Sequence, residues 1–305
     1  MLILKLTLRH KAMKELVQKL RKYEIRIRKA ITTQMQGDFH SVFKGTGLEF
    51  DDVRAYQYGD DVRSIDWNVS AKGHGVFVKT YREEKEQSVF LMLDVSASQT
   101  IGTGRQQKLD VGKEICGVLA LSAARQQSQI GIICFSDQKE KYIKPAKGIQ
   151  QAYTLIKALH ELQPKSAKTN LAAGIRLTLD IIKRRSIILL ISDFIDVRYE
   201  KELGMLAKRH DLIVIQLQDL REQQLPSMGI VPVRDKESGK ILWLNTSGKE
   251  FQRSYLNQYA ENQHVVERIC QKYQANYLTI RTDGDYVPQL INLFRLRNKS
   301  VKKSA

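Results

Sequence analysis

The chain contains few cysteines and no long apolar run. Cys116, Cys134 and Cys270 lie far apart, in apolar surroundings and without Cys-x-x-Cys spacing. This pattern is typical of buried, reduced core residues in a cytoplasmic protein. No stretch approaches the ~20 apolar residues of a membrane-spanning helix. Lys5 interrupts the apolar start, and no small-residue cleavage site follows, so we also expect no signal peptide.

Acidic residues are also scarce, with 33 Asp and Glu against 50 Lys and Arg, which gives a formal net charge of +17. Residues 1–36 hold ten basic residues against Glu15 and Glu24, a local excess of 10 − 2 = +8, and residues 296–305 form a basic tail. Such charge suits a nucleic acid, an anionic membrane surface or an acidic protein partner. It also suits a solvated helix face. No zinc finger or other nucleic-acid recognition module accompanies it, so polyanion binding is the alternative function.

The length and composition fit a soluble globular protein: 305 residues, 42% hydrophobic and 27% charged. Strand and helix patterns alternate from Ser88 onward. The expected strands are 89–93, 129–135, 140–144, 185–192, 211–217 and 275–280, with a hairpin at 231–244 that turns at Ser238-Gly239. The expected helices are 106–127, 148–162, 171–183, 198–209, 249–273 and 287–296. This alternation predicts an α/β fold with a doubly wound, mostly parallel sheet.

Two further segments precede this domain, which we place at residues 87–295. Residues 1–36 include a long basic helix from about His10 to Gln36, with apolar residues near helical spacing. We expect its apolar stripe to pack on the domain, although a basic amphipathic helix can also lie on a membrane surface.

Residues 37–86 interleave acids and arginines with aromatic residues. We expect an irregular segment followed by a strand at 75–81. The segment contains Gly45-Thr-Gly47, but this is no phosphate loop because it lacks the Gly-Lys-Ser/Thr ending. Its polar side chains form either a network that fixes the loop to the main domain or a surface for docking a partner. These residues are Glu49, Asp52, Arg54, Tyr56, Asp60, Asp61, Arg63, Asp66 and Trp67.

Oxygen-bearing side chains follow the most apolar strands. Asp94, Ser96 and Ser98 come at the end of the strand 89–93, and Asp193 follows the strand 185–192. Thr169 stands just before the helix 171–183, where it or Asn170 would serve as the N-cap. Because ligands bind at the carboxyl ends of strands in such sheets, we expect these groups to meet. Carboxylates and hydroxyls suit one Mg²⁺ ion, with Mn²⁺ and Ca²⁺ as alternatives.

The order of these residues resembles the metal-ion-dependent adhesion site of von Willebrand factor type A domains. The resemblance implies that Asp94, Ser96, Ser98 and Thr169 hold the ion directly or through water, and that Asp193 acts through water. Two neighbours depart from the usual pattern. Gln99 stands where many type A domains have Met, and Phe194 stands where many have Gly. We expect Phe194 to narrow access to the metal.

The segment Glu49-Phe-Asp-Asp-Val-Arg-Ala-Tyr with Gly59-Asp-Asp-Val-Arg-Ser-Ile-Asp-Trp resembles the bacterial domain of unknown function fifty-eight. Its members place this motif before a type A domain and are associated with MoxR-type AAA+ ATPases. Two carboxylates and neutral hydroxyls would leave the ion electrophilic, so we expect a non-enzymatic adaptor for such an ATPase. It would bind a partner protein's acidic side chain through the metal, without a small-molecule substrate. A metal-dependent phosphohydrolase is the enzymatic alternative, but its Asp-x-Asp motif is absent because residue 96 is Ser.

Overall fold

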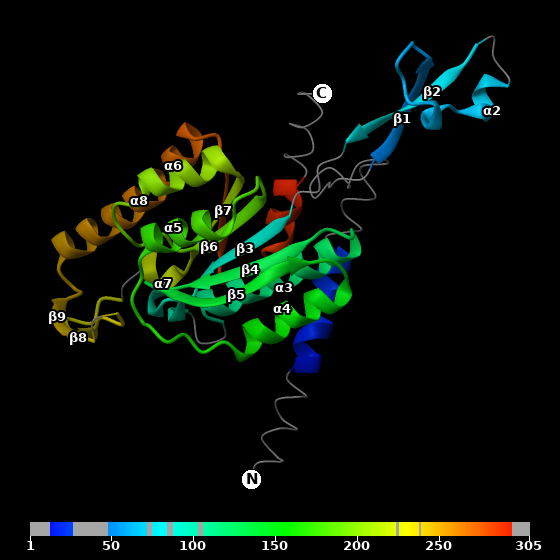
Figure 1. Ribbon diagram of the computed structural model, residues 1–305. Helices are drawn as coiled ribbons and strands as arrows, with labels where there is room; N and C mark the ends of the chain where they lie inside the picture. The colour runs from blue at the N-terminus through cyan, green and yellow to red at the C-terminus, as the bar shows by residue number, and fades with distance from the viewer. Residues whose placement is uncertain are drawn as a thin grey trace. The chain divides into compact units, whose positions relative to one another are not determined.

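The computed structural model describes residues 13–26, 48–71, 75–83, 88–102, 106–223, 226–237 and 239–294 (Figure 1). The chain divides into two compact units, of which residues 44–87 form the smaller and all other residues the larger. The predicted tail at 296–305 and parts of the predicted helix at 10–36 lie outside the described residues; residues 13–26 are helical.

The larger unit is built on a six-stranded sheet in the order β10-β7-β6-β3-β4-β5. The strands are β3 (Val89–Asp94), β4 (Ile130–Phe135), β5 (Lys139–Ala146), β6 (Ile187–Ser192), β7 (Asp211–Gln218) and β10 (Asn276–Arg281). All neighbours are parallel except β5, which pairs with β4 in the antiparallel direction. The predicted α/β fold with a mostly parallel sheet is therefore confirmed.

Two apolar layers sandwich this sheet. Side chains alternate across β3, so Leu91 and Leu93 join one core cluster and Phe90 and Met92 join the other. The first layer contains α3 (Lys108–Arg125), α4 (Ile149–Glu161) and the helical residues 13–26 and 287–294. The second contains α5 (Leu171–Ile181), α6 (Glu200–Arg209) and α8 (Lys249–Lys272). Because helices cover both faces, the central strands read as continuous apolar runs.

The cysteines behave as predicted inside these layers. Cys116, Cys134 and Cys270 are all buried and unpaired. Burial raises the pKa of the Cys134 thiol, and that of Cys270, to about 12. In the part of the chain that the structure describes, no helix has the length and apolarity to cross a membrane.

A hairpin and a short helix lie outside the central sheet. The strands β8 (Ile230–Arg234) and β9 (Ile241–Asn245) pair in the antiparallel direction, as predicted. The turn between them places Gly239 at φ 70°, the left-handed region that glycine adopts without strain. The short helix α7 (Leu220–Gln223) was not predicted, because four residues show no helical period.

The smaller unit differs from the expected irregular segment. It contains β1 (Leu48–Ala55), paired antiparallel with β2 (Phe77–Glu83), together with η2 (Val62–Ser64) and α2 (Trp67–Ser70). The acids along β1 hide its strand character in the sequence, whereas backbone pairing with β2 does not depend on side-chain polarity. The pairing also shifts register between Phe50 and Asp52, which blurs any period-two pattern.

We predict that Gly174→Ala destabilises the larger unit by about 1–2 kcal/mol, because overpacking outweighs the gain in helix propensity. A Cβ atom at Gly174 would lie 2.3 Å from Cδ2 of the buried Phe135 ring, which would have to move. Urea unfolding measures the effect. The control Gly284→Ala adds a Cβ in open space, and its expected change is within about 0.5 kcal/mol. Equal stabilities of the two variants would contradict the prediction.

We also predict that His210 makes stability fall in acid. Burial, followed by the charges of Arg209 and Arg185, lowers its pKa from 6.5 to about 4, and neither ring nitrogen has a hydrogen-bond partner. The unfolded chain therefore takes up a proton first as pH falls. The stabilisation, up to about 3 kcal/mol, is complete above pH 6.5 and is lost as pH falls to about 4. Unfolding free energies of wild type and His210→Leu should differ between pH 7 and pH 4 by this amount; a constant difference would refute it.

Candidate metal centre

Asp94 ends the central strand β3 and is completely buried. Its Oδ1 accepts a hydrogen bond from the backbone N–H of Ser96 at 3.0 Å. Its Oδ2 accepts from Ser192 Oγ at 2.7 Å and from Gln99 Nε2 at 3.3 Å. Two donors occupy Oδ2 and one occupies Oδ1, so Oδ1 retains a lone pair for another ligand.

The two serines lie in the turn that follows. Ser96 precedes the 3₁₀ helix η3 (Ala97–Thr100), and its side chain does not cap that helix. Instead, Ser96 Oγ and Ser98 Oγ lie 3.1 Å apart. Asp94, Ser96 and Ser98 therefore present one carboxylate and two hydroxyls at one corner of the sheet.

The loop before α5 is bound to this turn. The Ala97 N–H donates to the Ala167 carbonyl at 2.9 Å, so the two loops lie side by side. Asn170, and not Thr169, caps α5, because its Oδ1 accepts from the Ala173 N–H at 2.8 Å. The Thr169 hydroxyl does not cap the helix and instead donates to the carboxylate of Glu237.

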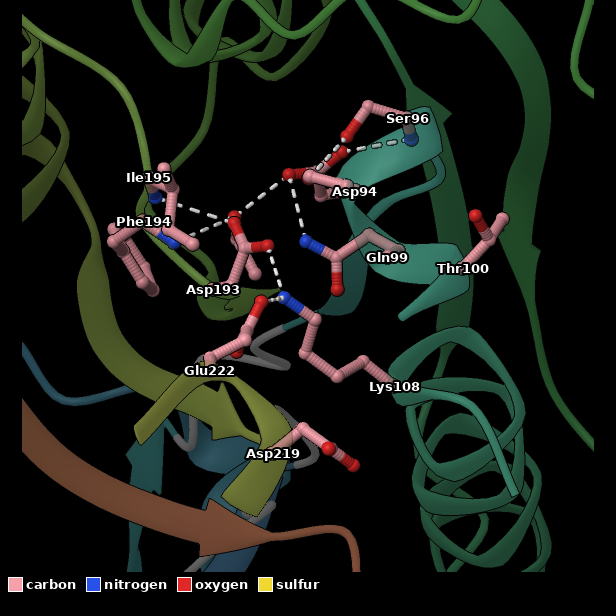
Figure 2. A network of polar contacts seen from close by, with 12 residues as sticks. Asp94, Ser96, Gln99, Thr100, Lys108, Asp193, Phe194, Ile195, Asp219 and Glu222 are labelled. Atoms are coloured by element: carbon pink, nitrogen blue, oxygen red, sulfur yellow. Dashed lines mark hydrogen bonds and ion pairs between the residues drawn. The ribbon is translucent and has the colours of Figure 1, made fainter. Parts of the chain in front are cut away.

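Asp193 follows β6 and is paired with a buried lysine (Figure 2). Lys108 Nζ lies 2.6 Å from Asp193 Oδ2 and also forms an ion pair with Glu222 of α7. The Lys108 side chain is completely buried. Burial alone would lower its pKa, but the two carboxylates outweigh burial and raise the pKa above its ordinary value. Lys108 is therefore charged.

Sequence reasoning missed Lys108 and Glu222. A lysine in the first turn of α3 and a glutamate in a four-residue helix look like ordinary surface residues in one sequence. Only the tertiary structure reveals their role, because Lys108 of α3 and Glu222 of α7 come together only in the folded unit.

Phe194 was expected to narrow access to the metal, but its ring is buried in the core cluster beside Tyr199, with ring centroids 5.9 Å apart. Its backbone adopts φ 59°, in the left-handed region. Glycine enters this region without strain, which explains physically why glycine suits the position.

The charges of this corner favour a cation. Burial, and after it the neighbouring Asp193, raises the pKa of Asp94 from 3.8 to about 6. This corner holds three carboxylates and one ammonium group, because Lys108 pairs with Asp193 and Glu222 and the charge of Asp193 also acts on Asp94. A divalent ion would balance this excess and relieve the repulsion between Asp94 and Asp193.

The donor set also fits such an ion. Asp94 Oδ1, Ser96 Oγ and Ser98 Oγ are hard oxygen ligands, and Mg²⁺ usually completes its shell with water. Both oxygens of Asp193 already accept hydrogen bonds, from Lys108 and from the Ile195 N–H, which suits a role through water. Among the described residues, no group of three or more His, Cys, Asp or Glu side chains could hold a metal. A metal here would therefore depend on the hydroxyl ligands.

The polar motif of the smaller unit forms contacts within that unit. Arg54 makes two hydrogen bonds to Asp60, at 2.7 and 2.6 Å. Asp61 and Asp66 accept from backbone N–H groups and cap η2 and α2. Trp67 is 67% exposed and Tyr58 is fully exposed. The acids therefore shape local turns, and the docking role of this surface stays a prediction.

Basic residues of the helix at 13–26 contact the larger unit. Lys19 Nζ lies 2.5 Å from Glu114, and Arg26 lies 2.7 Å from Asp285. Arg21 donates to the hydroxyl of Tyr153. Leu20 is buried in the first core layer, which agrees with the expected packing of the apolar stripe. These contacts leave less free positive charge on this helix than the sequence suggests.

The sequence is similar to known proteins along most of its length. The family described as "Protein of unknown function DUF58" matches residues 52–265. An uncharacterized protein of Mycobacterium tuberculosis strain H37Rv is 25% identical over 288 residues, which cover 93% of this chain and 90% of that protein. One from Mycobacterium avium is 27% identical over 137 residues, 45% of this chain and 80% of that protein.

Solved structures with a similar arrangement include the conserved hypothetical protein BatB of Bacteroides thetaiotaomicron. The two chains share 15% sequence identity with a TM-score of 0.47, over 71% of this chain and 99% of BatB. The VWA domain of SpRpn10 is 12% identical with a TM-score of 0.39, over 68% of this chain and 94% of that domain.

We predict that Lys108→Met destabilises the larger unit by about 3–5 kcal/mol, because it leaves Asp193 and Glu222 buried without their cation. Chemical unfolding in EDTA measures this without any contribution from metal. The matched control is Lys113→Met on the same helix, where the side chain is only partly buried. Its expected loss is below about 1 kcal/mol. Similar losses for both variants would contradict a special role for Lys108.

Proposed function

The chain belongs to the family described as "Protein of unknown function DUF58", a description that names no activity, and from its site we propose a non-enzymatic, metal-dependent protein-binding module. One divalent cation, Mg²⁺ or alternatively Mn²⁺ or Ca²⁺, would bind at the end of β3. The single observation that carries the proposal is that the Asp94 carboxylate and the hydroxyls of Ser96 and Ser98 lie in one turn. The Ser96 N–H donates to Asp94 Oδ1, and the two hydroxyl oxygens lie 3.1 Å apart.

The balance of charge explains why such an ion would bind a partner. Asp193 is already paired with Lys108, so Asp94 is the carboxylate with a free lone pair. Neutral hydroxyls supply the other protein ligands and leave most of the positive charge of the ion uncompensated. An acidic side chain of a partner protein is the ligand that completes this charge balance. We propose a MoxR-type AAA+ ATPase in the cytoplasm as this partner, because the residue motifs resemble proteins associated with such ATPases.

The chemistry of the corner favours binding over hydrolysis. A metal-dependent hydrolase needs a positioned general base or a second metal. The histidines that the structure describes are His160, His210 and His264, and none of them hydrogen-bonds to a residue of the candidate site. Polyanion binding is the weaker alternative, because Lys19, Arg21 and Arg26 are engaged with the larger unit.

We predict that the protein binds Mn²⁺ or Mg²⁺ and that Asp94→Asn weakens this binding by more than about 10-fold, because it removes the charged ligand. Isothermal titration calorimetry measures the affinity. Asp180→Asn is the matched control, because Asp180 lies exposed on α5. The metal affinity of this variant should equal that of wild type.

The partner is tested separately. A purified MoxR-type ATPase should be retained by immobilised wild type with metal, and lost with EDTA or in Asp94→Asn. Retention that EDTA leaves unchanged would refute metal-dependent binding. No retention under any condition would refute this partner. The metal site would still be tested independently by the calorimetry.

A further inference from the structure

The tip of the β8–β9 hairpin lies against the candidate metal centre and contacts it at two points. Lys236 Nζ donates to the carbonyl of Thr100 at 2.9 Å and to its Oγ1 at 2.8 Å. Thr100 ends η3, the short helix that carries Ser98. Beside Lys236, the Glu237 carboxylate accepts a hydrogen bond from the Thr169 hydroxyl. One turn of the hairpin therefore contacts both ligand-bearing loops.

The turn is shaped to direct Glu237 toward the site. The Glu237 N–H donates to Asp235 Oδ1 at 3.1 Å, and the Asp235 N–H donates to the Lys240 carbonyl at 2.9 Å. Asp235 and Lys236 are exposed, whereas Glu237 is half-buried. A carboxylate in a surface turn is normally well solvated, whereas that of Glu237 is partly withdrawn from solvent and is paired with a neutral hydroxyl, so a cation at this position would stabilise it.

We propose that Glu237 is an internal ligand of the candidate metal centre. Its carboxylate takes the position that the acidic side chain of a partner would take, so that a partner binds only when the hairpin tip is displaced. This inference rests on the proposed function, because it assigns the occupant of the same open position. It adds a residue that the Asp-x-Ser-x-Ser pattern does not contain, over 60 positions after Thr169.

Displacement of the tip is compatible with the packing of the hairpin. Ile241 is 61% exposed and Trp243 is 69% exposed, so the strands bury little apolar surface. The contact of Lys236 with Thr100 is exposed, and exposed polar contacts contribute little to stability. The bond of Glu237 to the metal would then be the main interaction that holds the tip in place.

The test uses the full chain and Mn²⁺ alone, with two readouts. Calorimetry gives the metal affinity, and hydrogen–deuterium exchange follows the backbone amides of residues 230–245. In wild type, Mn²⁺ should slow exchange in this hairpin. In Glu237→Gln, which keeps the size of the side chain but removes its charge, Mn²⁺ should bind about 10-fold more weakly and leave hairpin exchange unchanged. Glu250→Gln, an exposed position at the start of α8, is the control and should behave as wild type.

The outcomes separate this inference from the function on which it rests. Equal affinity and equal hairpin protection in wild type and Glu237→Gln would overturn the internal ligand, while binding that still requires Asp94 would leave the metal centre in place. Metal binding by wild type without hairpin protection would also overturn it. No metal binding by wild type would overturn both proposals.

Discussion

The buried ammonium group of Lys108 is the interaction on which the candidate site depends. It joins the start of α3, the loop after β6 and the short helix α7, three segments far apart in the sequence. A buried charge is tolerated only with partners, and here two carboxylates surround it. The same pairing fixes Asp193 and leaves Asp94 as the carboxylate with coordination capacity. The pairing of Lys108 with Asp193 and Glu222 therefore both holds these three segments together and sets the charge of the site.

The order of the strands sets which loops surround Asp94. β3 pairs with β6, so its carboxyl end adjoins the loop that carries Asp193. The loop that carries Thr169 is held beside the turn after β3 by the hydrogen bond from the Ala97 N–H to the Ala167 carbonyl. Burial of every residue of β3 explains why its terminal carboxylate is dehydrated, and why hydrogen bonds from Ser96, Ser192 and Gln99 are needed to hold it. The hairpin turn adds the carboxylate of Glu237 next to Thr169. The corner therefore combines a carboxylate held in place at the end of β3, that of Asp94, with a carboxylate from a surface turn, that of Glu237.

Much of this arrangement is visible in the sequence. The apolar runs of β3 and β6 end at Asp94 and Asp193, and the carboxyl ends of neighbouring parallel strands must meet. The hairpin was also predicted, from its turn residues. Lys108, Glu222 and Glu237 were not, because each is a charged residue in a segment that reads as surface. Their importance comes from contacts over 60 or more positions, which no local pattern encodes. The strand β1 was missed for a related reason, since its acids conceal the backbone pairing.

The two tryptophans of the chain fall in different places, Trp67 in the smaller unit and Trp243 in strand β9 of the hairpin. Both are mostly exposed to solvent. Replacement of either one leaves a single tryptophan, whose fluorescence can be excited selectively over that of the 12 tyrosines. The two replacements therefore yield separate optical signals, one for the Asp- and Arg-rich unit and one for the segment beside the candidate metal centre, without any added label.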